Sequence, residues 1–474
     1  MFDERQRMFD LPRSTWDDYD KSLISQGGGV FLRSEKSIKI SPQVKAALGI
    51  EEDELDPTSL MKAILKASVD LLWNGGIGTY VKATDESHQD VGDRANDNIR
   101  INGCELNCKV VGEGGNLGFT QKGRIEYALN KGKINTDAMD NSAGVDCSDH
   151  EVNIKIALIA AMRDKKIDLE ERNKVLESMT DEVSKLVLMD NRFQTQAISV
   201  ALSQGFQALG DQSHFILALE ETGLLNRKIE FLPSKKEIEK RQIEKVGLTR
   251  PELCVMMAYA KMDIYNNLLN SDLLEDKYFE NELLHYFPKA MQEKFSAEIL
   301  NHQLRKEIIA TQITNFAVNK TGITFINQLC KNSGFALSDV IKNFIIAFDS
   351  FELRNLWQQI EDLDGKVDPK LQLEMFTGAN KLLERSVMWL LRNQTKAEIS
   401  TLVERFKKIA NELYSLLPEV LATSSKESFD RKIKKYTQGN IDKNHKFNQS
   451  HLVLELDKIL LPTKTKYTTW DKEL

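Results

Sequence analysis

The sequence predicts an α/β fold followed by an all-α fold, and the main reason is the change in glycine content along the chain. Of the 25 glycines, 16 fall in residues 1–150, where several follow short apolar runs. Glycines in that position are typical of a sheet with functional turns. The rest of the chain is poor in glycine and proline and has apolar residues at helical spacing. We therefore expect one domain over residues 1–165 and a second, helical domain over residues 166–474.

The composition narrows the class of protein. A chain of 474 residues is long enough for several domains with well-buried cores. Its net charge is −7 and no segment is strongly basic, so nucleic acid is not expected as a partner. The N-terminus lacks the apolar stretch of a signal peptide, and no apolar run approaches the roughly 20 residues of a membrane span. Five widely spread cysteines imply no disulfide framework. We expect a soluble cytoplasmic protein with reduced thiols and no membrane partner.

The first predicted strand covers residues 69–73. This run is almost entirely apolar and has the length of a strand that is buried on both faces. It follows a helix-like stretch over 60–67 and ends in Asn74-Gly75-Gly76. In open α/β sheets, ligands bind at the carboxyl ends of strands, so this turn is a candidate binding segment.

A second strand, predicted over residues 108–111, also runs into a glycine-rich turn. Its glycines are Gly112, Gly114, Gly115 and Gly118. The spacing is close to the dinucleotide fingerprint but is not a clean GxGxxG. Two interpretations remain open: the turn approaches a nucleotide, or its glycines only permit a tight chain reversal with positive φ.

A third turn, over residues 141–145, is predicted to open a long helix at Ser148. Ser148 and Glu151 match a capping box, in which the serine satisfies free amides of the first helical turn. The same helix end could instead hold an anion such as a substrate carboxylate. The two interpretations are compatible, because a carboxylate can share the site with the cap.

No metal site and no catalytic residue are expected from the residue pattern. Several potential ligands are crowded near Ser148, among them Asp146, Asp149 and His150, but successive helical positions point in different directions. Cys104 and Cys108 have no second pair nearby for a structural zinc site. No Ser/His/Asp or Cys/His arrangement can be picked out, and His150 is interpreted as a helix-end residue.

From Glu151 onward the helical period dominates. The segment Thr249-Arg250-Pro251-Glu252 predicts a helix start with proline at an early position. A basic segment, residues 426–446, is interpreted as a solvated loop. Further helices are expected at 192–209, 213–222, 235–245, 250–270, 298–318, 338–347, 370–392, 396–416 and 446–460.

Taken together, these segments carry a resemblance to a known family. The chain resembles the C-terminal portion of the large bacterial NAD-dependent glutamate dehydrogenases over essentially its whole length. The segments that carry the resemblance are LPRSTWDDYD (11–20), GGGVF (27–31), DLLWNGGIGTYVKA (70–83), VGDRANDNIR (91–100), VVGEGGNLGFTQKGRIE (110–126), NTDAMDNSAGVDCSDHEVNIKI (135–156) and GLTRPELCVMMAYAK (247–261).

The resemblance implies the oxidative deamination of L-glutamate to 2-oxoglutarate and ammonia, with NAD as the cofactor. It also implies that residues 1–165 are part of a Rossmann-like NAD-binding domain, and that the protein is a homo-oligomer. Glu113-Gly114-Gly115-Asn116 is similar to the family's Glu-Gly-Ala-Asn turn, whose asparagine and adjacent backbone meet the nicotinamide ribose. By the same resemblance, Gly75 and Gly76 line the path of the ribose and adenine.

Two further roles follow by position in the family motif. Residues 141–145, Asn-Ser-Ala-Gly-Val, are similar to an Asn-Ala-Gly-Gly-Val segment, which places Asn141 at the nicotinamide end. Ser148 falls where the family has a serine that holds the side-chain carboxylate of the substrate. This implied role favours Ser148 as a substrate ligand over Ser148 as a plain cap.

The family's catalytic lysine and aspartate and its pyrophosphate loop have no counterpart that we identify here. In the family they lie on an upstream segment. We therefore expect a truncated or split enzyme that works with this upstream segment in cis or in trans, because imine formation and hydrolysis need such groups. The alternative is a catalytically silent remnant whose helical domain acts only in assembly or regulation.

Overall fold

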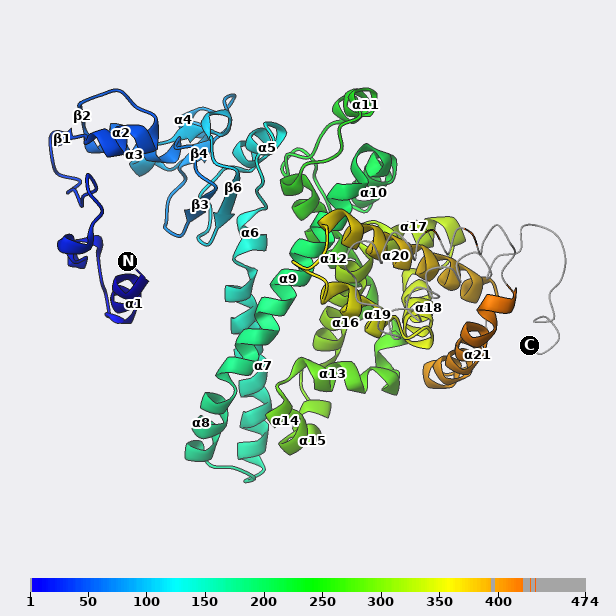
Figure 1. Cartoon of the computed structure of the whole chain (residues 1–474). Coiled ribbons are helices and arrows are strands. Elements are labelled where there is room, and N and C mark those ends of the chain that lie inside the picture. The colour runs from blue at the N-terminus through cyan, green and yellow to red at the C-terminus, as the bar shows by residue number, and fades with distance from the viewer. Residues whose placement is uncertain (1, 394–396, 421–426, 428–430, 432–474) are drawn as a thin grey trace. The chain divides into compact units, whose positions relative to one another are not determined.

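The computed structural model describes residues 2–393, 397–420, 427 and 431 (Figure 1). The helix predicted over 446–460 and nearly all of the loop predicted over 426–446 lie outside these residues. The described chain divides into two compact units, which we call the sheet unit (Met1–Ser142 with Thr249–Cys254) and the helical unit (Ala143–Leu248 with Val255–Leu474). These units are defined by spatial proximity, so the domain boundary predicted at residue 165 stays a prediction.

The sheet unit contains short paired strands surrounded by helices. Strand β3 (Leu71–Asn74) pairs in parallel with β6 (Val110–Glu113), with Leu71 opposite Val110 and Asn74 opposite Glu113. Strand β4 (Val81–Lys82) is parallel to β5 (Ile101–Asn102), and β1 (Ile38–Lys39) is antiparallel to β2 (Glu54–Leu55). The helices are α1 (Phe2–Asp10), α2 (Pro42–Leu48), α3 (Pro57–Leu65), α4 (His88–Val91), α5 (Gln121–Leu129) and α6 (Asp137–Asp140). An α/β arrangement with parallel strands is thus confirmed in its coarse form.

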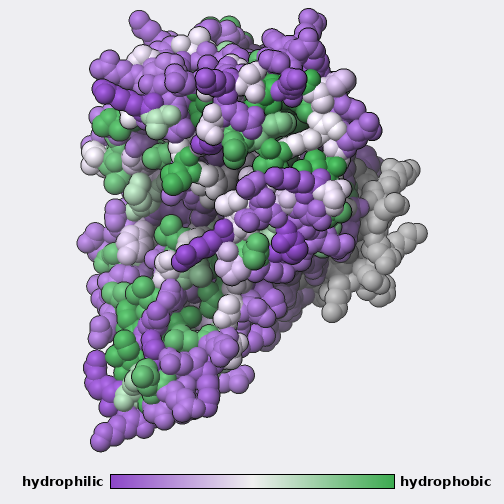
Figure 2. Space-filling view, turned by 90° about the vertical axis from the view of Figure 1, so that its left-hand side faces the viewer, coloured by the Kyte–Doolittle hydropathy of each residue, from purple (hydrophilic) through white to green (hydrophobic). Residues whose placement is uncertain are grey.

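Strand β3 is not buried on both faces, so that prediction is wrong. Leu71 is 56% exposed and Trp73 is 62% exposed, whereas Leu72 packs against the core around Val81 and Phe119. Successive strand residues point to opposite faces, and in the described part of the chain no second layer covers the face of Leu71 and Trp73. Figure 2 looks onto the sheet unit and shows hydrophobic residues at the surface among hydrophilic ones.

The helical unit is built from long helices packed on one another. Its N-terminal helices are α7 (Ser142–Arg163), α8 (Leu169–Ser178), α9 (Thr180–Gln204), α10 (Leu209–Glu221) and α11 (Lys235–Glu244). They are followed by α12 (Arg250–Leu269, of which the residues through Cys254 belong to the sheet unit), α13 (Glu280–Tyr286), α14 (Lys289–Lys294), α15 (Ser296–Leu300), α16 (Arg305–Thr321) and α17 (Phe325–Ser333). The last ones are α18 (Leu337–Ser350), α19 (Leu353–Glu361), α20 (Pro369–Arg392) and α21 (Ile399–Val420). Among the residues described, no helix is long and apolar enough to span a membrane.

Most of the predicted helices are present, because their apolar residues repeat at the helical period. Those predicted at 250–270 and 370–392 agree within one residue with α12 and α20. The helix predicted at 298–318 is instead divided between α15 and α16, with His302 between them. The predicted start at Thr249 is confirmed, since Glu252 accepts hydrogen bonds from the backbone N–H and the hydroxyl of Thr249 at 2.7 and 2.8 Å.

Candidate functional site

The two glycine turns that follow β3 and β6 lie against each other in the sheet unit. Because the strands are parallel and Asn74 is opposite Glu113, both turns leave the sheet at the same edge. The carbonyl of Asn74 accepts hydrogen bonds from the N–H groups of Gly114 and Gly115 at 2.9 and 3.0 Å. A Cβ added at Gly115 would lie 2.5 Å from the carbonyl oxygen of Gly76. The structure therefore brings these predicted glycines together, and glycine at 115 is required by the backbone approach.

Two of the glycines have a packing role as well. A Cβ at Gly112 would lie 2.7 Å from the indole ring of Trp73, and one at Gly114 would lie 2.4 Å from the same ring. The indole therefore lies across the backbone of β6 on the exposed face of the strand pair. This packing explains Gly112 and Gly114 without any ligand, so a nucleotide is not needed to account for them.

Asn116 and Asn141, the two asparagines predicted at the nicotinamide end, are paired. The side-chain Nδ2 of Asn141 donates a hydrogen bond to Oδ1 of Asn116. Asn116 is exposed and Asn141 is half-buried. Asn141 ends α6, so a short helix carries it to the turn after β6. This hydrogen bond does not use Oδ1 of Asn141 or Nδ2 of Asn116.

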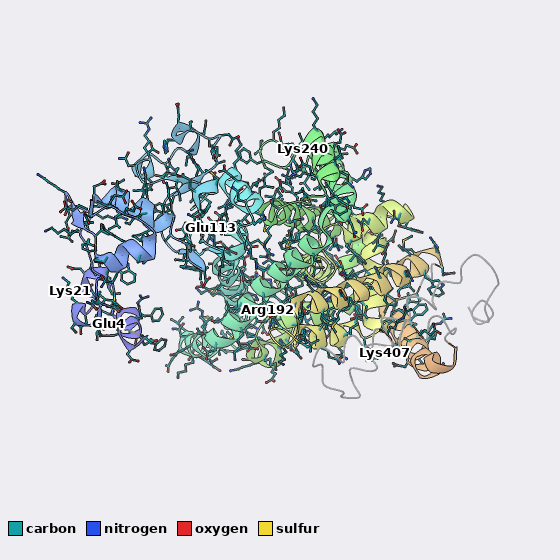
Figure 3. The ribbon with its side chains drawn as sticks, turned by 45° about the horizontal axis from the view of Figure 1, so that its top comes forward. Glu4, Lys21, Glu113, Arg192, Lys240 and Lys407 are labelled. Atoms are coloured by element: carbon teal, nitrogen blue, oxygen red, sulfur yellow. The ribbon has the colours of Figure 1, made fainter. Side chains whose placement is uncertain are left out.

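A buried ion pair lies beneath this turn. The carboxylate of Glu113, labelled in Figure 3, is fully buried and accepts hydrogen bonds from Nε and Nη2 of Arg124 at 2.7 and 3.0 Å. Arg124 also lies 3.2 Å from a carboxylate oxygen of Asp137. Burial raises the pKa of the Glu113 carboxyl, and the hydrogen bonds from Arg124 oppose that shift. Paired in this way, Glu113 holds the end of β6 against α5.

Two aspartates of α6 hold the backbone of the same turn. Oδ2 of Asp140 accepts a hydrogen bond from the N–H of Glu113 at 2.9 Å, and Oδ2 of Asp137 accepts one from the N–H of Leu117 at 2.8 Å. Leu117 has a φ of 59°, an uncommon conformation for leucine that this bond helps to hold. Sequence reasoning missed both aspartates. The two aspartates are three residues apart and come just before Asn141, and this spacing was the signal that could have identified them.

A cavity of about 290 Å³ lies at the end of β3 within the sheet unit. Gly75 and Gly76 line it together with Asn74 and the guanidinium-bearing Arg33. Nδ2 of Asn74 is buried and has no hydrogen-bond partner. The remaining lining residues are mainly apolar: Met61, Ile64, Leu65, Leu72, Trp73, Tyr80, Val81, Ile99 and Phe119. A largely apolar cavity of this volume with one cation at its wall suits a nucleoside-sized group better than a whole dinucleotide.

Ser148 does not begin a helix, so the predicted capping box is wrong. Helix α7 begins at Ser142, and Ser148 lies exposed in its second turn, with its hydroxyl 3.5 Å from the carbonyl oxygen of Gly144. The carboxylate of Glu151 pairs with Lys155 one turn later instead of capping the helix. Residues 142–147 continue the helix because their backbone N–H and C=O groups can form helical hydrogen bonds. The single glycine among them, Gly144, does not stop the helix. The role of Ser148 as a substrate ligand therefore rests on the family resemblance alone.

His150 is not a helix-end residue either, because it lies in the interior of α7 and is buried. Its surroundings belong to the helical unit, as do those of Ser148, whereas the glycine turns and both asparagines belong to the sheet unit. Six of the predicted site residues therefore belong to the sheet unit, and Ser148 belongs to the helical unit.

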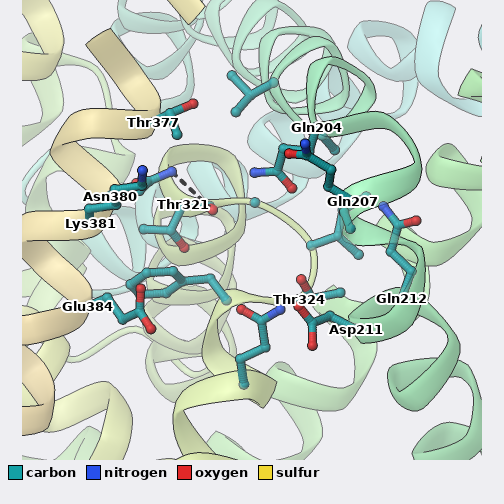
Figure 4. A pocket seen from close by; sticks show the side chains of 17 residues that line it. Gln204, Gln207, Asp211, Gln212, Thr321, Thr324, Thr377, Asn380, Lys381 and Glu384 are labelled. Atoms are coloured by element: carbon teal, nitrogen blue, oxygen red, sulfur yellow. Dashed lines mark hydrogen bonds between the residues drawn. The ribbon is translucent and has the colours of Figure 1, made fainter. Parts of the chain in front are cut away.

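A second cavity, of about 280 Å³, lies within the helical unit (Figure 4). Its wall combines polar and apolar side chains, and Nδ2 of Asn380 donates to the carbonyl oxygen of Thr321 at 3.3 Å. Oε1 of Gln212 and Oδ1 of Asn380 are buried there without a hydrogen-bond partner. The sequence analysis did not predict this cavity, because its walls come from helices that are far apart in the chain.

Comparison with known proteins identifies relatives of both parts of the chain. The model of the family "Bacterial NAD-glutamate dehydrogenase, catalytic domain" matches residues 1–201, and the model of "Glutamate dehydrogenase, C-terminal" matches residues 245–451. The NAD-specific glutamate dehydrogenase of Halomonas elongata is 46% identical over 405 residues, which are 85% of this chain and 25% of the relative. The enzyme of the same name from Pseudomonas aeruginosa is 47% identical over 83% of this chain and 24% of its own length. The one from Mycobacterium tuberculosis is 42% identical over 89% of this chain and 26% of its own length. The chain thus spans about a quarter of the length of the curated relatives it matches.

Proposed function

Because the chain belongs to the family of bacterial NAD-glutamate dehydrogenases, we propose that it carries part of an active site for the oxidative deamination of L-glutamate to 2-oxoglutarate and ammonia. The observation that carries this proposal is the meeting of two glycine turns at the carboxyl ends of the parallel strands β3 and β6. In open α/β sheets this is the edge at which nucleotides bind. The sheet unit is then part of a Rossmann-like NAD-binding domain.

When bound, NAD is the acceptor of the hydride that leaves Cα of glutamate. In this chain, the cavity at the end of β3 receives one nucleoside half of the cofactor, against Gly75, Gly76 and Arg33. The pair of Asn116 and Asn141 orients the nicotinamide end through the amide atoms that the two side chains do not use for each other. Gly115 supports this turn by allowing its close approach to Gly76.

Ser148 is the proposed ligand of the substrate's side-chain carboxylate. Its hydroxyl makes a long contact of 3.5 Å within the helix, so it loses little when it turns to a substrate oxygen. Its exposure in the second turn of α7 leaves the hydroxyl accessible. A hydroxyl-to-carboxylate hydrogen bond at this position would contribute to substrate binding without taking part in the chemistry.

The groups that form and hydrolyse the imine are proposed to come from another segment of a longer protein, in cis or in trans. Imine chemistry needs a lysine of lowered pKa and an acid–base carboxylate, and none of the residues of the candidate site supplies them. The exposed apolar face of Leu71 and Trp73 supports this proposal, since a strand in an α/β sheet is normally covered on both faces. The coverage of about a quarter of the relatives' length agrees with it.

The test is the rate of NADH formation from glutamate and NAD, measured by absorbance with this chain alone and with the upstream dehydrogenase polypeptide added. We expect activity in the mixture, and a loss of NAD affinity there in Asn116→Ala. The matched control is Asn130→Ala, which changes an exposed asparagine at the end of α5. Inactivity of the mixture, with both chains shown to be folded, would favour a silent assembly module.

A further inference from the structure

A second cluster of potential ligands lies inside the helical unit. It consists of Asp146 and His150 on α7 and Asp190 on α9. Asp146 and His150 are four residues apart, so they lie on the same face of α7. Helices α7 and α9 lie side by side (Figure 1), and one ligand atom from each of the three side chains comes within 4.8 Å of the other two. The cluster therefore combines one imidazole with two carboxylates.

The ring of His150 is held in place, but its Nδ1 lacks a hydrogen-bond partner. Its side chain is 3% exposed and stacks on Tyr286 with ring centroids 4.2 Å apart. The Tyr286 hydroxyl accepts a hydrogen bond from Nδ2 of Asn153 at 2.9 Å, which fixes the ring that packs on the imidazole. Nδ1 of His150 is buried without a partner, and so is Oδ2 of Asp146. Buried polar atoms without a partner are rare, and each of these residues has a second polar atom, Nε2 of His150 and Oδ1 of Asp146, that faces the other residue.

The separation of the two α7 side chains also fits a shared ion. Nε2 of His150 lies 3.9 Å from Oδ1 of Asp146, which is too long for a hydrogen bond. Two ligands that are each about 2.0–2.2 Å from one metal ion are separated by roughly 3–4 Å. The observed distance is thus typical of two atoms that face the same ion.

Two lysines act on the carboxylates of this cluster. Lys261 of α12 faces both Asp146 and Asp190, and its Nζ donates to Oε1 of Gln194 at 3.1 Å. Lys320 of α16 also acts on Asp190. The ammonium group of Lys261 is therefore the alternative to a metal ion as the cation of this cluster.

We propose that Asp146, His150 and Asp190 form a binding site for one divalent first-row metal ion, with water completing the coordination. A mixed set of imidazole and carboxylate ligands suits Mn²⁺ or Zn²⁺ better than Mg²⁺, which prefers oxygen ligands alone. The ion cross-links α7 to α9 in the helical unit. Sequence reasoning dismissed a metal here because it considered neighbours on one helix, whereas the third ligand comes from another helix.

The test measures metal binding by the metal-free 474-residue chain at pH 7. Electron paramagnetic resonance follows free Mn²⁺, and calorimetry follows Zn²⁺. We expect one tight equivalent per chain, and a loss of affinity of more than about tenfold in each of Asp146→Asn, His150→Gln and Asp190→Asn. Circular dichroism of each variant checks that it is folded.

Matched controls separate this site from adventitious binding. His302→Gln removes a buried histidine whose two ring nitrogens already have partners, the carbonyl of Asn153 and the N–H of Leu304, each at 3.1 Å. Asp263→Asn removes a carboxylate of α12 whose pKa burial raises. Both controls should keep the affinity of the wild type.

Two results would overturn the proposal. The first is binding that is the same in the wild type and in the three ligand variants, which indicates surface binding elsewhere. The second is a wild type that binds neither ion at millimolar concentration while Lys261→Met does bind. In that case the ammonium group of Lys261 is the cation of this cluster.

Discussion

Gly115→Ala is the substitution whose effect follows most directly from the geometry of the two turns. The new Cβ would lie 2.5 Å from the carbonyl oxygen of Gly76, 3.4 Å from its carbonyl carbon and 3.6 Å from that of Gly75. These are backbone atoms and cannot swing away as a flexible side chain could. The turns must therefore separate by about 0.9 Å to reach an ordinary contact distance, and overpacking of this kind costs about 1–3 kcal/mol.

The same movement weakens the hydrogen bonds between the turns. The N–H groups of Gly114 and Gly115 both donate to the carbonyl of Asn74, and losing one such bond costs about 0.5–1.5 kcal/mol. Part of this cost is already contained in the overpacking value, so we expect a total decrease of about 1–3 kcal/mol in the free energy of unfolding. The decrease should be confined to the sheet unit, because the altered contacts all lie there.

Urea unfolding measures the loss of stability. Amide hydrogen exchange, followed in peptides from β3 and β6, shows whether the loss lies in these strands. Gly76→Ala is the matched control, because a Cβ there meets nothing within 4 Å and Gly76 does not have a positive φ. It should change the stability by less than about 0.5 kcal/mol. Equal stability and equal exchange in the two variants would refute the close approach of the turns.

Three further predictions concern the buried charges and the substrate. Glu113→Gln leaves the buried guanidinium of Arg124 without its bidentate partner and should cost about 3–5 kcal/mol in urea unfolding; a cost below about 1 kcal/mol would contradict the ion pair. Ser148→Ala in the reconstituted enzyme should raise the KM for glutamate but not for NAD, and unchanged kinetics would remove Ser148 from the pocket. Asp146 has its pKa raised from 3.8 to about 6, so the folded chain binds this proton more tightly than the unfolded chain. In metal-free buffer, the stabilisation from this tighter proton binding by Asp146 is therefore present below pH 3.8 and is lost as the pH rises to about 6. The free energy of unfolding should fall by roughly 3 kcal/mol at most over this range. Asp146→Asn should abolish this part of the pH dependence, and an unchanged profile in unfolding titrations would contradict the shift.

The sequence alone was sufficient wherever the cause of a structure is local. The helices α12 and α20 follow from apolar spacing and from early prolines, which act within a few residues of the chain. The glycine turns after β3 and β6 follow from short apolar runs that end in glycine. The segments that carry the family resemblance are likewise a property of the sequence, and the family models confirm them.

Local reasoning failed where packing between distant segments decides the outcome. It treated Ser148 as a helix start, but the helix extends back to Ser142, because serine is tolerated in a helix interior when its hydroxyl bonds to the preceding turn. It treated residues 69–73 as buried on both faces, but Leu71 and Trp73 are exposed. Burial depends on which other segments cover the strand, and an apolar run does not determine which segments these are.

The tertiary structure alone decided which polar groups meet. Asp137 and Asp140 bind backbone N–H groups that lie 20 and 27 residues earlier in the chain, and Asp190 joins Asp146 and His150 from a different helix. Periodicity and capping report which face of an element is apolar, but they contain no information on which two elements will be neighbours. The sequence therefore determined the helices, the glycine turns and the family, whereas the packing of those elements decided the contacts within both candidate sites.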